Sequence, residues 1–244
     1  MKGFLLAVQF LTVIPLKIKD IGQKGLSGSA AYFPLAGLFI GLLLLGVNFI
    51  ISALNAPILA SSIILIVSLV VITGGMHLDG LCDSADAFLS GKPKEEMLDI
   101  MRDPRAGSLG VLSLVCVILL KIGLLYSIGK ALRPDALILM CVLSRWSMVF
   151  SLSNFAYARK EGKARAYMRE SNPGVFFRAT AITLAVVLLS LPFKGLLIWA
   201  IVAAATYLIN RFISKKIGGL TGDTIGATSE ISETLVLFSC FAIQ

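Results

Sequence analysis

The sequence predicts an all-α, polytopic membrane protein: a bundle of about six or seven transmembrane helices with an interfacial or re-entrant helix at its N-terminus. Hydrophobic residues make up 57% of the 244 residues, and charged residues only 15%. The mean hydropathy of +0.90 is far above that of a soluble domain. Apolar runs of about twenty residues recur along the chain. No linker interrupts them, so we expect residues 1–244 to form a single transmembrane domain.

The elements follow in order from the hydropathy pattern. Residues 1–16 are apolar but too short to span, which predicts an interfacial or re-entrant helix ending near Pro15. The spans are expected at about 31–54, 57–76, 108–129, 135–154, 175–191, 196–213 and 224–244. The last of these is just long enough to cross a bilayer.

The distribution of basic residues predicts the topology. Segments 1–30, 77–107, 155–178 and 210–220 contain 17 of the 22 Lys and Arg residues, whereas the opposite turns contain 3. Because basic residues accumulate in cytoplasmic loops, we expect these four segments to face the cytoplasm. The protein is therefore predicted to lie in the cytoplasmic (inner) membrane with its site on the cytoplasmic side.

Three acidic residues, Asp79, Asp83 and Asp86, follow the second predicted span. Their i, i+4, i+7 spacing places the carboxylates on one face of a helix. Carboxylates so close together repel one another and lose hydration beside a membrane. A bound divalent cation relieves both effects, and oxygen ligands suit Mg²⁺, Mn²⁺ or Ca²⁺. We therefore predict that these residues bind a divalent cation.

A second acidic stripe lies in GGLTGDTIGATSEISE, residues 218–233. Asp223 and Glu230 are seven residues apart, and Glu233 follows three residues later. Both stripes begin at a predicted cytoplasmic boundary, so we expect them to face each other across the bundle. One or two ions held between them would neutralise a pyrophosphate and orient it for displacement. The alternative is that these acids are ordinary solvated helix ends, because anions are favoured near helix N-termini.

Glycines and one histidine accompany the acids. Gly74-Gly75 and Gly222 permit either close helix packing or the approach of a phosphate to backbone N–H groups. Thr221 and Gly222 are therefore candidate substrate contacts. His77, the only histidine, is a candidate base or ligand, with a structural role as the alternative.

Asp103 and Arg105 stand where the third predicted span begins. Asp103 would complete a metal shell, and Arg105 would hold a phosphate in a bidentate contact. The alternative is an N-terminal turn with a solvated arginine.

Lys121 and Arg145 lie within predicted spans, where charged side chains usually face the bundle interior. Lys121 is either a deep substrate contact or the partner of an acid. Arg145 is likewise a candidate substrate contact. The basic loop from Arg159 to Arg169 either grips an anionic substrate or carries only the positive-inside signal.

Several function classes lack support in the sequence. It contains no Walker A motif, Rossmann fingerprint, CxxC pair or Ser/His/Asp order. The aromatic residues lie mostly in apolar runs without interleaved basic residues, so no nucleic-acid binding is predicted. The four cysteines are scattered without metal-ligand spacing, which predicts reduced thiols.

Five stretches together resemble one enzyme family, the cobalamin synthases (adenosylcobinamide-GDP ribazoletransferases). In chain order they are GGMHLDGLCDSADAF, RDPRAGSLGVL, SRW, YARKEGKA and GGLTGDTIGATSEISE. The resemblance covers nearly the whole chain, and its two acidic blocks are the most specific part.

The resemblance implies an Mg²⁺-dependent transferase of cobalamin nucleotide-loop assembly. Its partners would be adenosylcobinamide-GDP, α-ribazole or α-ribazole 5′-phosphate, and membrane lipid; the products would be adenosylcobalamin or its 5′-phosphate and GMP. The oligomeric state stays open. The expected Mg²⁺ ligands are the acids of both stripes: Asp79, Asp83, Asp86, Asp223 and Glu230. Asp83, His77 and Arg105 are the candidate catalytic residues, with the general base unassigned between His77 and the acids.

Two rival functions also require membrane-embedded acids. A CDP-alcohol-type phosphatidyltransferase would use a lipid acceptor, but its complete motif is not matched here. A divalent-cation transporter would carry its acids near the bilayer midplane, whereas these acids lie at one boundary.

Overall fold

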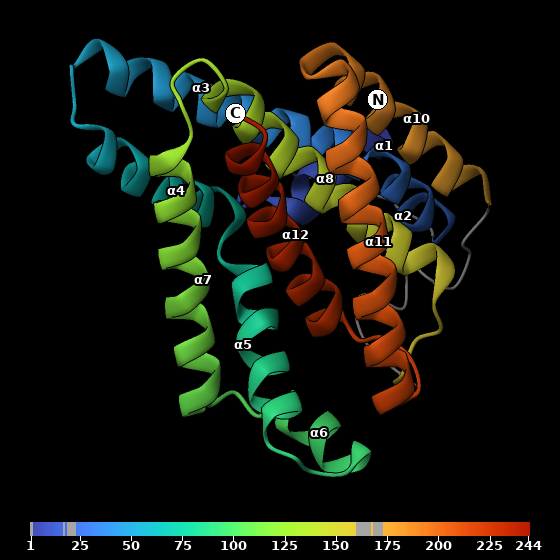
Figure 1. Cartoon of the computed structure of the whole chain (residues 1–244). Helices are drawn as coiled ribbons and strands as arrows, with labels where there is room; N and C mark the ends of the chain where they lie inside the picture. Colours follow the sequence, from blue (N-terminus) through green and yellow to red (C-terminus); the bar gives the residue numbers. More distant parts are fainter. Residues whose placement is uncertain (1, 17, 19–22, 160–166, 168–172) are drawn as a thin grey trace.

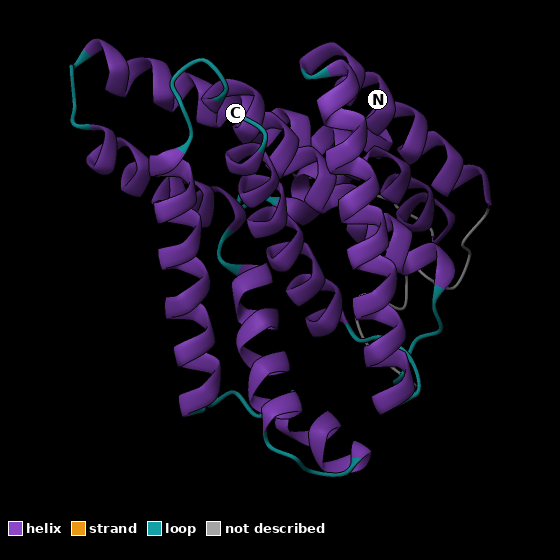
Figure 2. Cartoon of the chain, viewed as in Figure 1, coloured by secondary structure: helices purple, strands orange, loops and turns teal. Residues whose placement is uncertain are grey.

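The computed structural model describes all residues except 1, 17, 19–22, 160–166 and 168–172. Within those described ranges every regular element is a helix, as Figure 2 shows, which confirms the predicted all-α class. The helices in chain order are α1 (Lys2–Leu11), α2 (Gln23–Ser29), the 3₁₀ helix η1 (Ala30–Tyr32), α3 (Phe33–Ala53), α4 (Ile58–Thr73), α5 (Met76–Leu89), α6 (Lys94–Ile100), α7 (Ser108–Ser127), α8 (Arg133–Asn154), α10 (Pro173–Ser190), α11 (Pro192–Ile217) and α12 (Gly222–Ala242).

Helix α8 forms the centre of the bundle and is buried along most of its length. It packs against α3, α10, α11 and α12. Its backbone comes close to that of α3 at two glycines: a Cβ atom on Gly37 would clash with the carbonyl oxygen of Cys141, and one on Gly41 would lie 3.1 Å from the Cα of Ile138. Small residues at such crossings let helix backbones meet, which is the usual way membrane helices gain van der Waals contact.

Among the described residues, five helices are long and apolar enough to cross a membrane: the continuous stretch Gly25–Ala53, α7, α8, α10 and α11. A sixth is obtained if α4 and α5 count as one broken span. The chain is therefore a multi-pass membrane protein, with five or six candidate spans where about six or seven were predicted. The seventh predicted span, α12, is not among these helices. It is an interior helix whose hydroxyl and acidic side chains, such as Thr228 and Glu233, are enclosed by its neighbours.

The second predicted span is shorter than expected, because α4 ends at Thr73 and the chain turns by 91° into α5. Gly74 and Gly75 form this turn with φ angles of +67° and +69°. L-residues with a side chain rarely adopt such angles, so the glycine pair is used here for a turn. The turn makes the first acidic stripe a separate helix, α5, which runs beside α7 and α12 (Figure 1).

The N-terminal helix α1 is also shorter than the predicted 1–16 segment. It ends at Leu11, ahead of Pro15, and buries Leu6, Ala7, Val8 and Leu11. Ala7, Val8 and Leu11 belong to a core cluster with residues of η1, α3 and α8, so α1 packs against the bundle along one face.

Candidate active site

The two acidic stripes meet where α5 crosses α12. A Cβ atom on Gly80 would lie only 2.7 Å from the carbonyl oxygen of Asp223, and one on Gly226 would lie 3.3 Å from the Cα of His77. The two helices therefore touch backbone to backbone, in opposite directions. This contact brings Asp79 and Asp83 of α5 to the N-terminus of α12.

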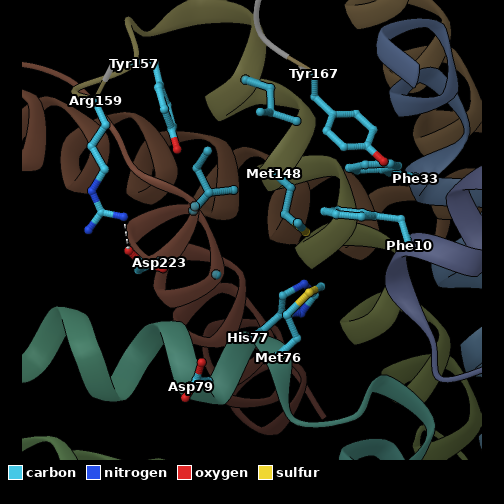
Figure 3. A pocket seen from close by; sticks show the side chains of 14 residues that line it. Phe10, Phe33, Met76, His77, Asp79, Met148, Tyr157, Arg159, Tyr167 and Asp223 are labelled. Atoms are coloured by element: carbon cyan, nitrogen blue, oxygen red, sulfur yellow. Dashed lines mark ion pairs between the residues drawn. The ribbon is translucent and has the colours of Figure 1, made fainter. Parts of the chain in front are cut away.

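The carboxylates at this crossing interact electrostatically. Asp83 is close enough to Asp79, Asp223 and Asp86 to be affected by the charge of each. A cation offsets part of this repulsion, because Arg159 forms an ion pair with Asp223 at 3.1 Å (Figure 3). Among the described residues the acids nevertheless outnumber the cations at this crossing, which favours a bound cation.

The start of α12 is fixed by local hydrogen bonds. The backbone N–H of Thr224 donates to the Thr221 hydroxyl oxygen, and the backbone N–H of Thr221 donates to the Thr224 hydroxyl oxygen at 2.9 Å. This reciprocal cap places Asp223 in the first turn of α12, where the helix dipole favours a negative charge. Thr221 is itself fully buried, and Gly222 lines a cavity beside Asp223.

The chain segment that follows α8 is tied to this helix start. The backbone N–H of Ala158 donates to the carbonyl oxygen of Leu220, and the N–H of Leu220 donates to that of Ala156, each at 2.8 Å. The pairing places Tyr157 and Arg159 next to Asp223. The other basic residues of the predicted loop, including Arg169, lie outside the described residues.

A cavity of about 270 Å³ opens at this crossing (Figure 3). Its polar side chains are those of Asp79, Asp223, Arg159, Tyr157 and His77. The remainder of its wall is apolar and includes three aromatic rings. The combination of a few convergent polar groups with an apolar wall is typical of small-molecule sites.

His77 is 3% exposed, and neither ring nitrogen has a hydrogen-bond partner among the described residues. Its ring lines the cavity at the start of α5. A buried polar group without a partner is costly, so it is a candidate for contact with a ligand.

Asp86 faces a different partner from Asp79 and Asp83. Its two carboxylate oxygens accept the backbone N–H groups of Gly107 at 2.7 Å and Gly110 at 2.8 Å. Asp86 thus caps the N-terminus of α7 from another helix, where a negative charge is favoured.

Asp103 and Arg105 form a solvent-exposed pair of their own. The Arg105 guanidinium donates to both carboxylate oxygens, at 2.9 and 2.7 Å. These bonds, followed by the Arg105 backbone N–H, lower the pKa of Asp103 to about 2. The pair is therefore present above pH 3.8 and is lost only as the pH falls toward 2.

Glu230 lies in a buried ionic cluster deeper in the bundle. Lys121 of α7 donates to Glu230 and to Glu233, and Arg145 of α8 donates to Glu233. Two cations and two anions thus balance one another between α7, α8 and α12. Of the two roles predicted for Lys121, the structure shows the partner of an acid.

Metal binding at this crossing depends on the donor chemistry. Within the described part of the chain, no three His, Cys, Asp or Glu side chains are gathered into a ready-made metal site. The carboxylates of Asp79, Asp83 and Asp223 are nevertheless the oxygen donors that Mg²⁺ prefers. Mg²⁺ usually takes only one or two carboxylates and completes its shell with water and substrate phosphates. This donor set therefore fits Mg²⁺ bound together with a phosphorylated substrate.

Sequence reasoning missed several residues of the site. Tyr157 is adjacent to Arg159 in the YARKEGKA stretch, which was a usable signal. Glu233 was recognised in the second stripe but not as the centre of an ionic cluster. Phe10 and Phe33 gave no signal, because aromatic residues of apolar runs look alike whether they face lipid or a cavity. Tyr167 gave none either, because it lies in the basic loop, where only the charges were considered.

Replacing Gly80 with alanine is expected to separate α5 from α12. The new Cβ would meet the backbone of Asp223, which cannot move as a side-chain tip can. We expect a loss of about 1–3 kcal/mol in stability and at least a tenfold loss of the activity proposed below. Thermal unfolding in detergent and a turnover assay measure the two effects. Gly123→Ala in α7 is the matched control, since nothing lies within 4 Å of its new Cβ, and it should preserve both properties.

Comparisons with known proteins identify the family of this chain. The family described as cobalamin-5-phosphate synthase matches residues 3–241. An adenosylcobinamide-GDP ribazoletransferase of Desulforamulus reducens is 37% identical, covering 96% of this chain and 93% of that protein. One of Caldanaerobacter subterraneus subsp. tengcongensis is 36% identical over 100% of this chain and 98% of that protein. No solved structure matches. The chain therefore belongs to the cobalamin-5-phosphate synthase family.

Proposed function

We propose that this protein joins adenosylcobinamide-GDP to α-ribazole or α-ribazole 5′-phosphate, giving adenosylcobalamin or its 5′-phosphate and GMP. Its family and the names of its relatives support this reaction. The observation that carries it is the crossing at Gly80 and Asp223, where acids from two distant segments line one cavity. The same comparisons do not favour a lipid phosphatidyltransferase or a cation transporter.

The reaction is an in-line displacement at phosphorus. A ribose hydroxyl oxygen of the acceptor attacks the phosphorus on the cobinamide side of the pyrophosphate. A new P–O bond forms, the P–O bond to the GMP phosphate breaks, and the hydroxyl proton leaves to a base. Positioning and charge stabilisation supply most of the catalysis in such transfers.

We assign a role to each polar side chain at this crossing. Asp79, Asp83 and Asp223 would hold Mg²⁺ together with the substrate pyrophosphate. A bound Mg²⁺ supplies neutralisation of that pyrophosphate and of the charge that develops on it. Arg159, paired with Asp223, is placed to contact a phosphate oxygen as well. Asp79 lines the cavity and is exposed, so its carboxylate is accessible to the ion and to the pyrophosphate.

The other predicted ligands are already engaged. Asp86 caps α7, Asp103 pairs with Arg105, and Glu230 pairs with Lys121. Each would have to leave its partner to bind Mg²⁺. Our proposed set therefore excludes them, and direct substrate contacts by Arg105, Lys121 and Arg145 remain sequence predictions.

We further propose that the site faces the cytoplasm from the inner membrane. The excess of Lys and Arg on one side of the predicted spans supports this orientation. Labelling of a cysteine introduced at Lys92, in the exposed turn between α5 and α6, tests it in intact cells. A membrane-impermeant reagent should reach this cysteine only after lysis. Labelling in intact cells would contradict the proposed orientation.

GMP release by the purified protein tests the reaction. Protein in detergent, supplied with adenosylcobinamide-GDP, α-ribazole 5′-phosphate and Mg²⁺, should release GMP and form the joined corrinoid in equal amounts. Release of GMP without acceptor, or transfer only to a CDP-activated lipid, would contradict the proposal.

Removal of divalent metal is expected to abolish this turnover. Because the acids would face the pyrophosphate uncompensated, excess EDTA should reduce GMP release to background. Mg²⁺ or Mn²⁺ added in excess should restore it. Full turnover in EDTA would show that the carboxylates act without a metal.

A further inference from the structure

The cavity has two chemically different ends. Asp79, Asp223 and Arg159 gather at one end, while Phe10, Phe33 and Tyr167 gather at the other (Figure 3). Met148 lies between the two groups in this view. A ligand that fills the whole cavity must therefore be polar or charged at one end and apolar at the other.

The aromatic end is a composite wall. The rings of Phe10 and Phe33 are stacked, with centroids 5.6 Å apart and planes inclined by 15°. The Tyr167 ring lies 4.7 Å from that of Phe10, and its hydroxyl is hydrogen-bonded with Ser29. The rings come from α1, α3 and the segment after α8, so no single helix repeat places them together. Walls of this kind bind flat aromatic groups by stacking.

His77 gives the cavity one polar contact away from the charged end. Its ring is almost fully buried, lines the cavity, and has no partner for either nitrogen among the described residues. In the neutral imidazole one nitrogen carries a proton and can donate it. An acceptor atom on a ligand in the cavity would satisfy that donor.

The volume limits what can enter. The cavity volume of about 270 Å³ is slightly below the range for ligand pockets, which runs from roughly 300 to 1,000 Å³. A nucleoside fits this scale, whereas a corrinoid ring system does not. The corrinoid ring system must then lie outside the cavity, with only the attached pyrophosphate at the charged end.

We propose that the aromatic end of this cavity is the subsite for the base of the acceptor nucleoside, and that His77 donates a hydrogen bond to a ring nitrogen of that base. The inference rests on the function proposed above and places the acceptor within that site. It assigns the subsite to two-ring aromatic bases with one ring-nitrogen acceptor and no exocyclic amino or keto group. The ribose then points toward Asp79 and Asp223, where its hydroxyl reacts.

Replacement of Phe10 tests the aromatic wall of the subsite. Phe10 is only half-buried, so its replacement carries less risk to folding than that of Phe33 or Tyr167. Phe10→Ala should raise KM for benzimidazole ribotide on the order of tenfold, the effect of losing one stacking contact, and leave KM for adenosylcobinamide-GDP unchanged. Phe4→Ala is the matched control: it lies on the same helix but packs on Phe39 outside the cavity. An equal rise in both KM values, or no rise, would overturn the subsite.

His77 is tested with two acceptors of the same shape. Benzimidazole ribotide has the ring-nitrogen acceptor, and indole ribotide has a C–H group in its place. The wild type should favour benzimidazole by about tenfold in kcat/KM, and His77→Phe should remove that preference. A general base would instead affect both acceptors equally, so a preserved ratio with uniformly low turnover would overturn the assignment.

The wild-type comparison needs no variant and separates the two proposals. If no acceptor yields GMP, the proposed function itself fails. If benzimidazole ribotide reacts but indole and adenine ribotides react equally well, the function stands and the subsite is wrong. A clear preference for benzimidazole over both supports the subsite, because adenine would bury an unpaired amino group.

Discussion

Replacing Asp83 with asparagine is expected to reduce GMP release on the order of a thousandfold, the scale seen when one essential charge-stabilising group is removed. Asparagine keeps the size of the side chain but lacks the charge that would bind Mg²⁺ and the pyrophosphate. Asp83 is half-buried beside Asp79 and Asp223, so losing its charge also relieves repulsion and should not unfold the protein. The turnover assay and size-exclusion chromatography in detergent measure the two effects.

Asp99→Asn is the control for this variant. Asp99 is an exposed acid of α6, and its side chain forms a loose pair with Arg102 at 3.9 Å. Its replacement should leave turnover within about twofold. An Asp83→Asn protein that turns over like the Asp99→Asn protein would remove Asp83 from the site.

Lys121→Met is expected to destabilise the protein more than any surface change. It would leave Glu230 and Glu233 with Arg145 as their remaining partner in the cluster, in a part of the bundle that excludes water. Breaking a buried ion pair by removing one partner costs about 3–5 kcal/mol. Thermal unfolding in detergent should show this as a lower midpoint.

The double variant Lys121→Met/Glu230→Gln separates charge balance from packing. It leaves Arg145 and Glu233 as a neutral pair, so it should recover much of the lost stability. If the double variant is no more stable than Lys121→Met alone, the cluster is not stabilised by its charge balance.

Much of the fold was predictable because a bilayer restricts the chain to apolar helices of about twenty residues. The predictions went wrong where a local conformation decided the path. The sharp turn at Gly74 and Gly75 depends on positive φ angles, whereas the sequence shows only that glycines are present. Helix α12 has the length predicted for the last span, but the sequence did not show that it lies inside the bundle, where its polar side chains find partners.

The site was predictable to the extent that it depends on spacing along one helix. The positions of Asp79 and Asp83 on α5 follow from the sequence, as does that of Asp223 on α12. Which acids face the cavity does not, because it depends on how α5 and α12 cross. That crossing is set by contacts between distant segments, and it leaves Asp86 at α7 and Glu230 at Lys121.

The central claim is that carboxylates from α5 and α12 hold one divalent cation together. Binding of Mn²⁺, followed by electron paramagnetic resonance in the presence of adenosylcobinamide-GDP, tests it most directly. Asp83→Asn and Asp223→Asn should each weaken Mn²⁺ binding at least tenfold, while Asp99→Asn should not change it. Unchanged Mn²⁺ affinity in the Asp223→Asn protein would show that the two helices do not share the ion.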